Sequence, residues 1–384
     1  MTDKNRKAKN IITADKRFSV SRREFLRNTL LASALLAVPD SILSSDKRFR
    51  AGYSESMEGS LVRCLLCPKK CVIPEGKTGF CGVRKNTGGV LYSLSYGHPC
   101  SVHADPIEKK PFFHVLPGSY SLSISTVGCN FECKFCQNWQ ISQSTPEMVH
   151  TSYTPPEKIV SKAVSNNLPS VTYTYGEPVV FIEYAQDISR LASEHGLKSF
   201  VVTNGYYNST PFRDLCGVID AVKIDLKGFT DSYYRKICAG TLRPVLDSIV
   251  QARKSGIWLE IVYLMIPTLN DSPDEIRRMA RWLVKNAGED VPIHFSRFFP
   301  QYKLKNLPPT PVSSLQTAYD ICSEEGMKFV YIGNVPGHRA ENSYCPSCGE
   351  MIMERQGYRI KSVNMKGASC AYCGERIPGI WDKG

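Results

Sequence analysis

Residues 127–140 read VGCNFECKFCQNWQ and contain three cysteines in the pattern C-x3-C-x2-C. The three are Cys129, Cys133 and Cys136. A closed structural metal site has four protein ligands, whereas a catalytic site keeps one position open. Three thiolates on one loop can hold three irons of a four-iron cluster and leave the fourth iron free for a ligand that is not protein. The alternative is a zinc knuckle that His98 or His114 completes.

The sequence around this loop alternates between apolar β-rich runs and amphipathic helical patterns. The expected strands are 121–128, 170–176, 198–205, 221–228, 258–267, 292–299 and 328–334. The clearest helical patterns are 156–167, 180–196, 272–288 and 313–326. Such alternation predicts an α/β fold with a parallel sheet.

The number of these units indicates a partial TIM-like (β/α)6-7 barrel. Seven units span residues 121–334, whereas a complete eightfold barrel typically needs about 250 residues. A doubly wound sheet is the alternative. The first expected strand is not followed by GxGxxG, which weakens the nucleotide-binding version of that alternative.

Polar residues recur at or near the ends of the expected strands. Cys129 follows the first strand, and the C-terminal strand ends are where barrels build their active sites. The further candidates are Gly176, Glu177, Asn204, Asp225, Lys227 and, within the sixth strand, His294. Each alone could be an ordinary cap or salt bridge. Together they predict one site, because a charged group at a barrel mouth needs a ligand or partner to offset its burial.

The cysteine pattern, with the aromatic Phe135 before the last cysteine, resembles the signature of the radical S-adenosylmethionine (SAM) superfamily. The resemblance implies a [4Fe–4S] cluster on Cys129, Cys133 and Cys136, with SAM chelating the open iron. It implies reductive cleavage of SAM to methionine and a 5′-deoxyadenosyl radical, which abstracts hydrogen from a substrate. It also implies a low-potential electron donor of the flavodoxin or ferredoxin type.

The same resemblance assigns roles to residues after the second and third strands. Residues 175–178 read YGEP and look like the family's GGEP motif, with Tyr175 in place of the first glycine. Gly176 and Glu177 match the motif, and Glu177 would hold the SAM amino group. Asn204 would lie near the ribose.

Two later positions resemble those of glycyl-radical-enzyme activases. Asp225 and Lys227 match the D-x-K motif, and His294 lies where activases carry a SAM-contacting histidine. A narrower similarity to the radical enzyme of AmmeMemoRadiSam systems rests on CLLCP (64–68), DPIEKKPFFH (105–114), CQNW (136–139) and YIGN (331–334). That family is a relative of pyruvate formate-lyase-activating enzymes, and the similarity covers roughly residues 60–384.

Three functions remain open at this point. The first is a radical SAM enzyme that activates or modifies a protein partner, which the activase-like residues favour. The second is a radical SAM enzyme that acts on a small molecule. The third is a non-enzymatic iron–sulfur or zinc protein for electron transfer or interaction.

Two further cysteine groups can each supply four thiolates. The C-terminal cysteine group, Cys345, Cys348, Cys370 and Cys373, forms two C-x2-C-G knuckles. It predicts a zinc ribbon, with a rubredoxin-like iron site, a cluster or disulfides as alternatives.

The N-terminal cysteine group consists of Cys64, Cys67, Cys71 and Cys81, spaced C-x2-C-x3-C-x9-C. This spacing predicts zinc or an auxiliary [4Fe–4S] cluster, with a cysteine-rich packing turn as the alternative. The remaining cysteines, Cys100, Cys216, Cys238 and Cys322, are expected in the core.

The net charge of +12 is concentrated near the start of the chain. Residues 1–28 contain nine Lys or Arg and three acidic residues, and the adjacent Arg22 and Arg23 precede a short uncharged stretch, 28–39. This arrangement predicts a twin-arginine export signal and a location in the cell envelope, with the cytoplasm as the alternative. The uncharged stretch is shorter than the roughly 20 residues of a membrane span. The rest of the chain after residue 28 is only mildly basic, so its charge predicts no nucleic-acid partner.

The expected organisation is a signal at 1–40, a linker at 41–60, and a cysteine-rich metal module with its connection at 61–120. The barrel follows at 121–340 and a zinc-ribbon-like module at 341–384.

Overall fold

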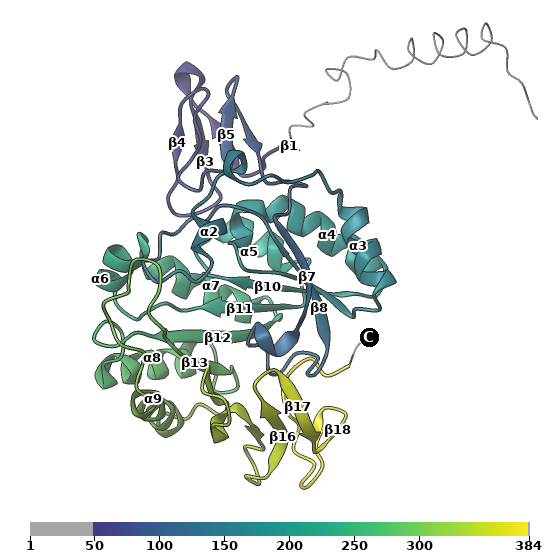
Figure 1. Ribbon diagram of the computed structural model, residues 1–384, viewed down its shortest axis with the longest axis vertical. Coiled ribbons are helices and arrows are strands. Elements are labelled where there is room, and N and C mark those ends of the chain that lie inside the picture. Colours follow the sequence, from purple (N-terminus) through teal and green to yellow (C-terminus); the bar gives the residue numbers. More distant parts are fainter. Residues whose placement is uncertain (1–48, 383–384) are drawn as a thin grey trace, which may run out of the picture. The chain divides into compact units, whose positions relative to one another are not determined.

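The computed structural model describes residues 49–382 (Figure 1). The predicted export signal at 1–40 lies outside these residues. Within them, no helix has both the length and the apolar character that crossing a membrane requires.

An eight-stranded sheet forms the centre of the fold, in the order β14-β13-β12-β11-β10-β9-β8-β7. The strands are β7 (Ser101–Pro106), β8 (Tyr120–Ser125), β9 (Ser170–Tyr173), β10 (Lys198–Thr203), β11 (Ala221–Asp225), β12 (Trp258–Met265), β13 (Ile293–Arg297) and β14 (Val330–Gly333). Strands β8 to β14 are parallel, and β7 pairs antiparallel with β8. The predicted α/β fold with seven parallel barrel strands is therefore confirmed.

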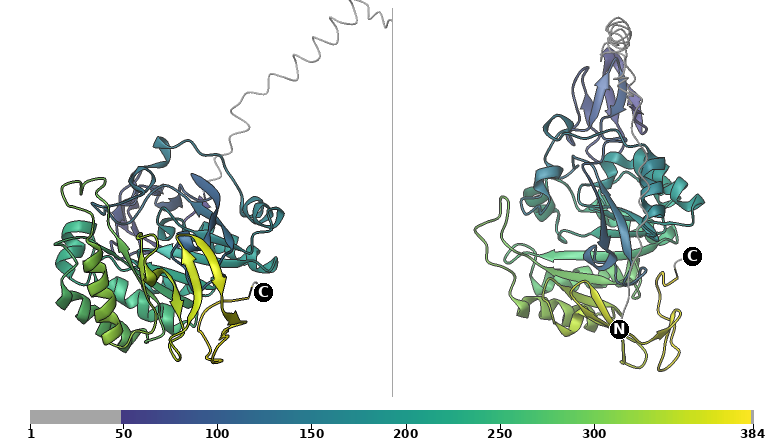
Figure 2. Two further views of the ribbon diagram at one scale, coloured as in Figure 1. Left: turned by 60° about the horizontal axis from the view of Figure 1, so that its bottom comes forward. Right: turned by 45° about the vertical axis from the view of Figure 1, so that its right-hand side comes forward.

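Helices cover the outer face of this sheet, as Figures 1 and 2 show. The main ones are α3 (Pro156–Ser165), α4 (Ile182–Glu194), α5 (Ser209–Cys216), α7 (Arg243–Lys254), α8 (Pro273–Asn286) and α9 (Val312–Glu324). In α8 the buried residues Ile276, Met279, Ala280 and Leu283 recur at helical spacing, with Pro273 at the first turn. Four of the six were expected from such patterns, whereas α5 and α7 were not.

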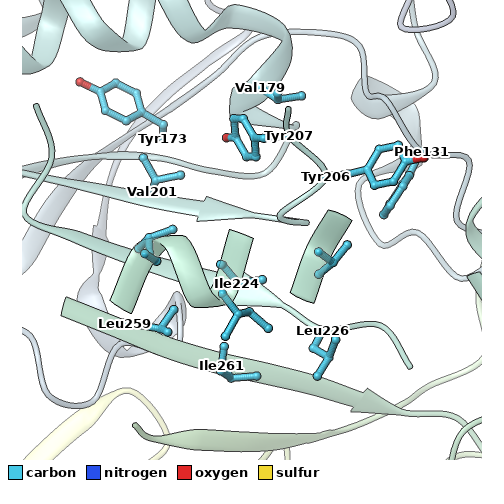
Figure 3. Close-up of a cluster of buried hydrophobic side chains, with 14 of the residues drawn as sticks. Phe131, Tyr173, Val179, Val201, Tyr206, Tyr207, Ile224, Leu226, Leu259 and Ile261 are labelled. Atoms are coloured by element: carbon cyan, nitrogen blue, oxygen red, sulfur yellow. The ribbon is translucent and has the colours of Figure 1, made fainter. Parts of the chain in front are cut away.

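The two faces of the sheet carry different side chains, because successive residues of a strand point to opposite faces. Val201, Ile224 and Ile261 point to the helices and join the main buried cluster (Figure 3). The alternate residues point inward and are largely polar; among them Lys223 lies opposite Glu260 in the register of β11 and β12. The inner face can therefore hold charges that the outer face cannot.

The connection between β7 and β8, residues 107–119, fills the inner face near the N-terminal ends of the strands. Ile107 and Phe112 pack against Phe200 and Ala221 near the starts of β10 and β11. The C-terminal segment joins this contact, since Ile380 N donates to His114 O at 2.7 Å and Leu116 N donates to Ile380 O at 2.7 Å. This end of the barrel is thereby closed, away from the strand ends that carry the site.

Glu260 anchors this closure with a buried carboxylate. Its oxygens accept from the backbone N–H of Phe113 at 3.0 Å and of His114 at 2.9 Å. They also accept from Trp258 Nε1 at 3.0 Å and from His294 Nε2 at 2.7 Å. Burial alone would raise the pKa of Glu260, but the hydrogen bonds and the neighbouring histidines outweigh burial and lower it to about 2.

An N-terminal module precedes the sheet and consists of two small antiparallel sheets, β1-β6-β5 and β2-β3-β4. Its strands are β1 (Phe49–Arg50), β2 (Ser54–Ser56), β3 (Val62–Cys64), β4 (Val72–Ile73), β5 (Arg84–Thr87) and β6 (Val90–Ser93). The linker expected at 41–60 is therefore corrected from Phe49 onward, because Ala51 is buried and Phe49 stacks on Tyr96. Strand β7, expected in the module, belongs to the main sheet.

The C-terminal module contains β15 (Ser343–Tyr344), β16 (Met351–Gln356), β17 (Arg359–Val363), β18 (Met365–Lys366) and β19 (Ser369–Cys370). Strands β16 and β17 form an antiparallel hairpin between the two cysteine knuckles. Buried Arg355 joins the module to the closed end of the barrel. Its guanidinium lies 4.1 Å from the ring centroid of Phe113 and donates to Phe113 O at 2.9 Å and to Ser343 Oγ at 2.8 Å.

We expect Glu260→Leu to lower the free energy of unfolding by about 3–5 kcal/mol, because it leaves buried N–H donors without their acceptor. The matched control is Glu55→Leu, which removes an exposed ion pair with Arg63 and should cost less than about 1 kcal/mol. Urea denaturation of both variants measures the difference. Equal losses would show that Glu260 does not anchor the closure.

Candidate active site and cysteine groups

The cysteine loop, residues 126–138, follows β8 at its carboxyl end. The π-helical turn η6 (Tyr234–Cys238) supports it from the side. Glu132 N donates to Cys238 O at 3.0 Å and Lys134 N donates to Ile237 O at 3.0 Å. These backbone bonds fix the part of the loop that carries the second and third cysteines.

The thiols of this loop have defined neighbours. Phe131 N lies 3.4 Å and Asn204 Nδ2 lies 3.9 Å from Cys129 Sγ. The neighbouring Cys238 and burial together raise the pKa of Cys133 well above its ordinary value. Cys238 is buried as expected, but its contact with Cys133 was missed because no sequence spacing links the two.

Glu177 is positioned by the loops after β9 and β10. Its Oε2 accepts from Asn204 N at 2.8 Å, its Oε1 accepts from Val179 N at 3.2 Å, and the hydroxyl of Thr203 donates to Oε1. Burial raises the pKa of Glu177 to about 7, although these hydrogen bonds oppose the rise. A buried carboxylate of this kind is well suited to accept a cationic group of a ligand.

The two residues before Glu177 explain how the loop tolerates its departure from GGEP. A Cβ on Gly176 would lie 2.5 Å from Thr126 O, so a larger residue does not fit there. Tyr175 adopts φ +67°, the left-handed conformation that favours glycine. Its hydroxyl donates to Asp105 and its carbonyl accepts from Asn138 Nδ2 at 3.0 Å, and these contacts stabilise the strained residue.

Three charged residues alternate along the end of β11. Asp225 Oδ2 lies 2.8 Å from Lys227 Nζ, and Asp225 Oδ1 lies 2.9 Å from Lys223 Nζ. Burial raises the pKa of Asp225, but the two lysines outweigh it and lower the pKa to about 2. Lys223 was missed from the sequence, although its spacing of two residues from Asp225 places it on the same face of the strand.

Phe135 connects this charged group with the cysteine loop, since Lys227 Nζ lies 5.9 Å from the centroid of its ring. The loop after β13 adds a cover. Lys303 N donates to Lys134 O at 2.9 Å, and Trp139 stacks on Tyr302 with ring centroids 5.1 Å apart. The cysteine loop is thus enclosed by segments from distant parts of the sequence.

His294 lies at the closed side of the inner face. It is 1% exposed, its Nε2 bonds to Glu260, and its ring stacks on Tyr331 with centroids 4.9 Å apart. Among the residues that the structure describes, its hydrogen bond and ring contacts are with Glu260, Phe113 and Tyr331. A contact between His294 and SAM remains a prediction.

The C-terminal cysteine group brings its four sulfurs within 4.8 Å of one another. Cys345 Sγ lies 3.6 Å from Cys373 Sγ, and Cys348 Sγ lies 3.8 Å from Cys370 Sγ. Sulfurs this close suit the vertices of a tetrahedron around one ion with metal–sulfur bonds of about 2.3 Å. The group can therefore hold a single metal ion.

The N-terminal cysteine group lines one pocket in the N-terminal module, next to the cysteine loop. A Cβ on Gly128, whose φ is +94°, would lie 2.6 Å from Cys81 O. Only glycine allows the cysteine loop to approach the module this closely.

Several known proteins are similar to this chain. A family model described as the radical SAM superfamily matches residues 123–283. An uncharacterized protein of Methanocaldococcus jannaschii is 44% identical over 329 residues, which are 85% of this chain and 98% of that protein. The pyruvate formate-lyase-activating enzyme of Clostridium pasteurianum is 26% identical over 41% of this chain and 67% of its own length.

Among solved structures, a domain of the pyruvate-formate lyase-activating enzyme from Bacteroides vulgatus aligns with 43% of this chain and 99% of its own. The identity is 19% and the TM-score is 0.39.

We expect Cys348→Ser to remove about one metal ion per chain, because it deletes one of four ligands from a closed tetrahedral site. The neighbouring Ser347→Ala is the control and should keep the ion. Elemental analysis of the anaerobically purified proteins identifies the metal and its amount. Unchanged metal content in the Cys348 variant would contradict a metal site in this group.

Proposed function

This chain belongs to the radical SAM superfamily, and from that premise we propose that it is an activase-like enzyme whose substrate is a protein partner. The observation that carries the proposal is the placement of the three-cysteine loop beside Glu177 and the Asp225–Lys227 pair. All of them lie at the carboxyl ends of parallel strands.

The residues present fit the cofactors that the superfamily implies. Cys129, Cys133 and Cys136 offer three thiols from one loop, which would hold a [4Fe–4S] cluster with one iron open to SAM. When bound, these cofactors supply a 5′-deoxyadenosyl radical by one-electron cleavage of SAM. The protein's task is then to orient SAM and to keep water out.

Glu177 is the residue that would accept the amino group of SAM. Its carboxylate is already held by Asn204 N and Thr203, so little reorganisation accompanies binding. Asn204 itself, which follows β10, would lie near the ribose of SAM. Gly176 lets this loop pack closely against Thr126 and so helps to position Glu177, since a Cβ there would collide with Thr126 O.

Asp225 and Lys227 would fix the orientation of SAM from the neighbouring strand. The ion pair keeps Lys227 charged: burial alone would lower its pKa, but Asp225 and Cys133 outweigh burial and raise it. The Phe135 ring lies beside this ammonium and shields it from water. A charged pair that is held before binding needs no rearrangement when a ligand arrives.

Two observations support a protein partner. A relative of this chain is named for activating another enzyme, pyruvate formate-lyase. In addition, Trp139 in the cysteine-loop region and Phe299 after β13 are 40% and 50% exposed, and exposed aromatic side chains are enriched at protein interfaces. The segment that closes the barrel, residues 107–119, packs at the opposite strand ends and not against these two aromatic side chains.

Zinc is the ion that we propose for the C-terminal cysteine group, because four thiolates in tetrahedral spacing are typical of structural zinc sites.

The similarity to the radical enzyme of AmmeMemoRadiSam systems and the export signal remain part of this proposal. Fractionation of cells with an antibody against the chain tests the signal.

The radical chemistry is tested by measuring 5′-deoxyadenosine after anaerobic reconstitution, reduction with dithionite and addition of SAM. We expect the wild-type chain to form it and Cys133→Ala to lose this activity, because only two cluster thiolates remain. The control is Cys216→Ala, which removes a buried cysteine outside the three groups. Product from the Cys133 variant at the wild-type rate would argue against the site.

The class of substrate is tested with cells of the host organism grown in deuterated medium. Dialysis divides their extract into retained macromolecules and a dialysate of small molecules, and each fraction is incubated with the reconstituted enzyme and SAM. We expect the retained macromolecules to transfer deuterium into 5′-deoxyadenosine, and protease treatment of this fraction to abolish the transfer. Transfer from the dialysate alone would instead identify a small molecule as the substrate.

A further inference from the structure

The N-terminal cysteine group converges on one pocket. Cys64, Cys67, Cys71 and Cys81 all line it, and apolar side chains such as Leu66 complete its wall. The chain holds the group together locally, since Cys64 N donates to Cys71 O at 2.9 Å and Phe80 N lies 3.5 Å from Cys71 Sγ. Four thiols around one space are a full ligand set for a metal centre.

The spacing of the sulfurs separates two kinds of centre. Across residues 49–382, the C-terminal group is the only set with three or more metal-ligating atoms mutually within 4.8 Å. The N-terminal group is therefore more widely spaced, although its thiols share a pocket. The loop of Cys129, Cys133 and Cys136 is wide in the same way, and the superfamily assigns that loop a four-iron cluster. A cube of four irons separates its cysteine sulfurs further than one ion does.

The charges around the pocket are suited to an anionic centre. Arg84 and Lys69 line it. Arg84 is fully buried, and two of its nitrogens bind Glu183 at 2.6 Å each. Its third nitrogen, Nε, has no hydrogen-bond partner in the described part of the chain. A buried N–H donor without an acceptor indicates a group that the protein itself does not supply, and sulfur in a thiolate cluster can accept such a bond.

The pocket also lies beside the active-site cysteines. Asn130 lines it and accepts from Asn204 Nδ2 at 2.8 Å, and the same nitrogen lies 3.9 Å from Cys129 Sγ. Cys81 O abuts Gly128 at the start of the cysteine loop. Asn130 and Asn204 together therefore connect the pocket with Cys129.

We propose that Cys64, Cys67, Cys71 and Cys81 hold a second [4Fe–4S] cluster, fully ligated by cysteine, that passes electrons to the cluster of the cysteine loop. One electron enters from a flavodoxin- or ferredoxin-type donor, which is oxidised by one electron. The same electron then reduces the cluster at Cys129, Cys133 and Cys136. A zinc ion at this place could not carry it, because zinc has no redox chemistry.

The cluster is tested in a variant with Cys129, Cys133 and Cys136 all changed to alanine. After anaerobic reconstitution we expect about four irons and four sulfides per chain, and a cluster spectrum by electron paramagnetic resonance after reduction. Retention of the metal at the C-terminal group reports that this variant has folded. A folded variant without iron, or with a second zinc ion, would overturn the proposal.

The converse variant, Cys67→Ala/Cys71→Ala, should lose about four irons and keep the cluster of the cysteine loop. With dithionite, which is small enough to reduce that cluster directly, it should still form 5′-deoxyadenosine; with reduced flavodoxin the rate should fall. A rate that does not depend on the donor would overturn the electron-transfer role. Iron content tests this second cluster independently of the proposed function, because it does not require SAM cleavage.

Discussion

The buried carboxylate of Glu260 is the constraint on which the arrangement of the barrel depends. The main sheet ends at β7 on one side and at β14 on the other. Its inner face must therefore be covered by other segments that also supply partners for its polar side chains. Glu260 holds the cover in place, because its carboxylate accepts hydrogen bonds from the backbone N–H groups of residues 113–114 and from His294 on the neighbouring strand β13. The same connection carries Phe113, on which Arg355 of the C-terminal module lies. Strand β12, the connection at 107–119 and the C-terminal module are therefore joined through the carboxylate of Glu260.

With one end closed, the chemistry is confined to the other. Parallel strands bring their carboxyl ends to one edge, so residues far apart in sequence become neighbours there. Glu177 follows β9, Asn204 follows β10, and Asp225 ends β11. Their polar groups are held by backbone N–H groups or by lysines, which fixes their positions before a ligand arrives. The N-terminal module contacts the same edge and brings a second set of thiols to it.

Much of this could be predicted from the sequence, because strand periodicity and short-range motifs are local signals. All seven parallel strands and four of the main helices were found in that way. Helices α5 and α7 were not among the predicted ones. Glu260 was missed as an anchor residue because its partners come from other segments of the chain. Cys238 was missed because no sequence spacing links it to Cys133, whereas the spacing of two residues between Lys223 and Asp225 was a local signal that could have been used. The linker at 41–60 read as polar, yet burial of Ala51 and stacking of Phe49 place its last part in the N-terminal module.

The contact between Gly128 and Cys81 has a consequence for biosynthesis. Translation releases the N-terminal module before the cysteine loop, but the module is also held by later residues, since Arg84 binds Glu183 and Leu65 O accepts from Asn208 Nδ2. The loop and the module must therefore come together while the rest of the barrel folds. A larger residue at position 128 would push the loop away from Cys81 and so separate the two cysteine groups as the chain folds.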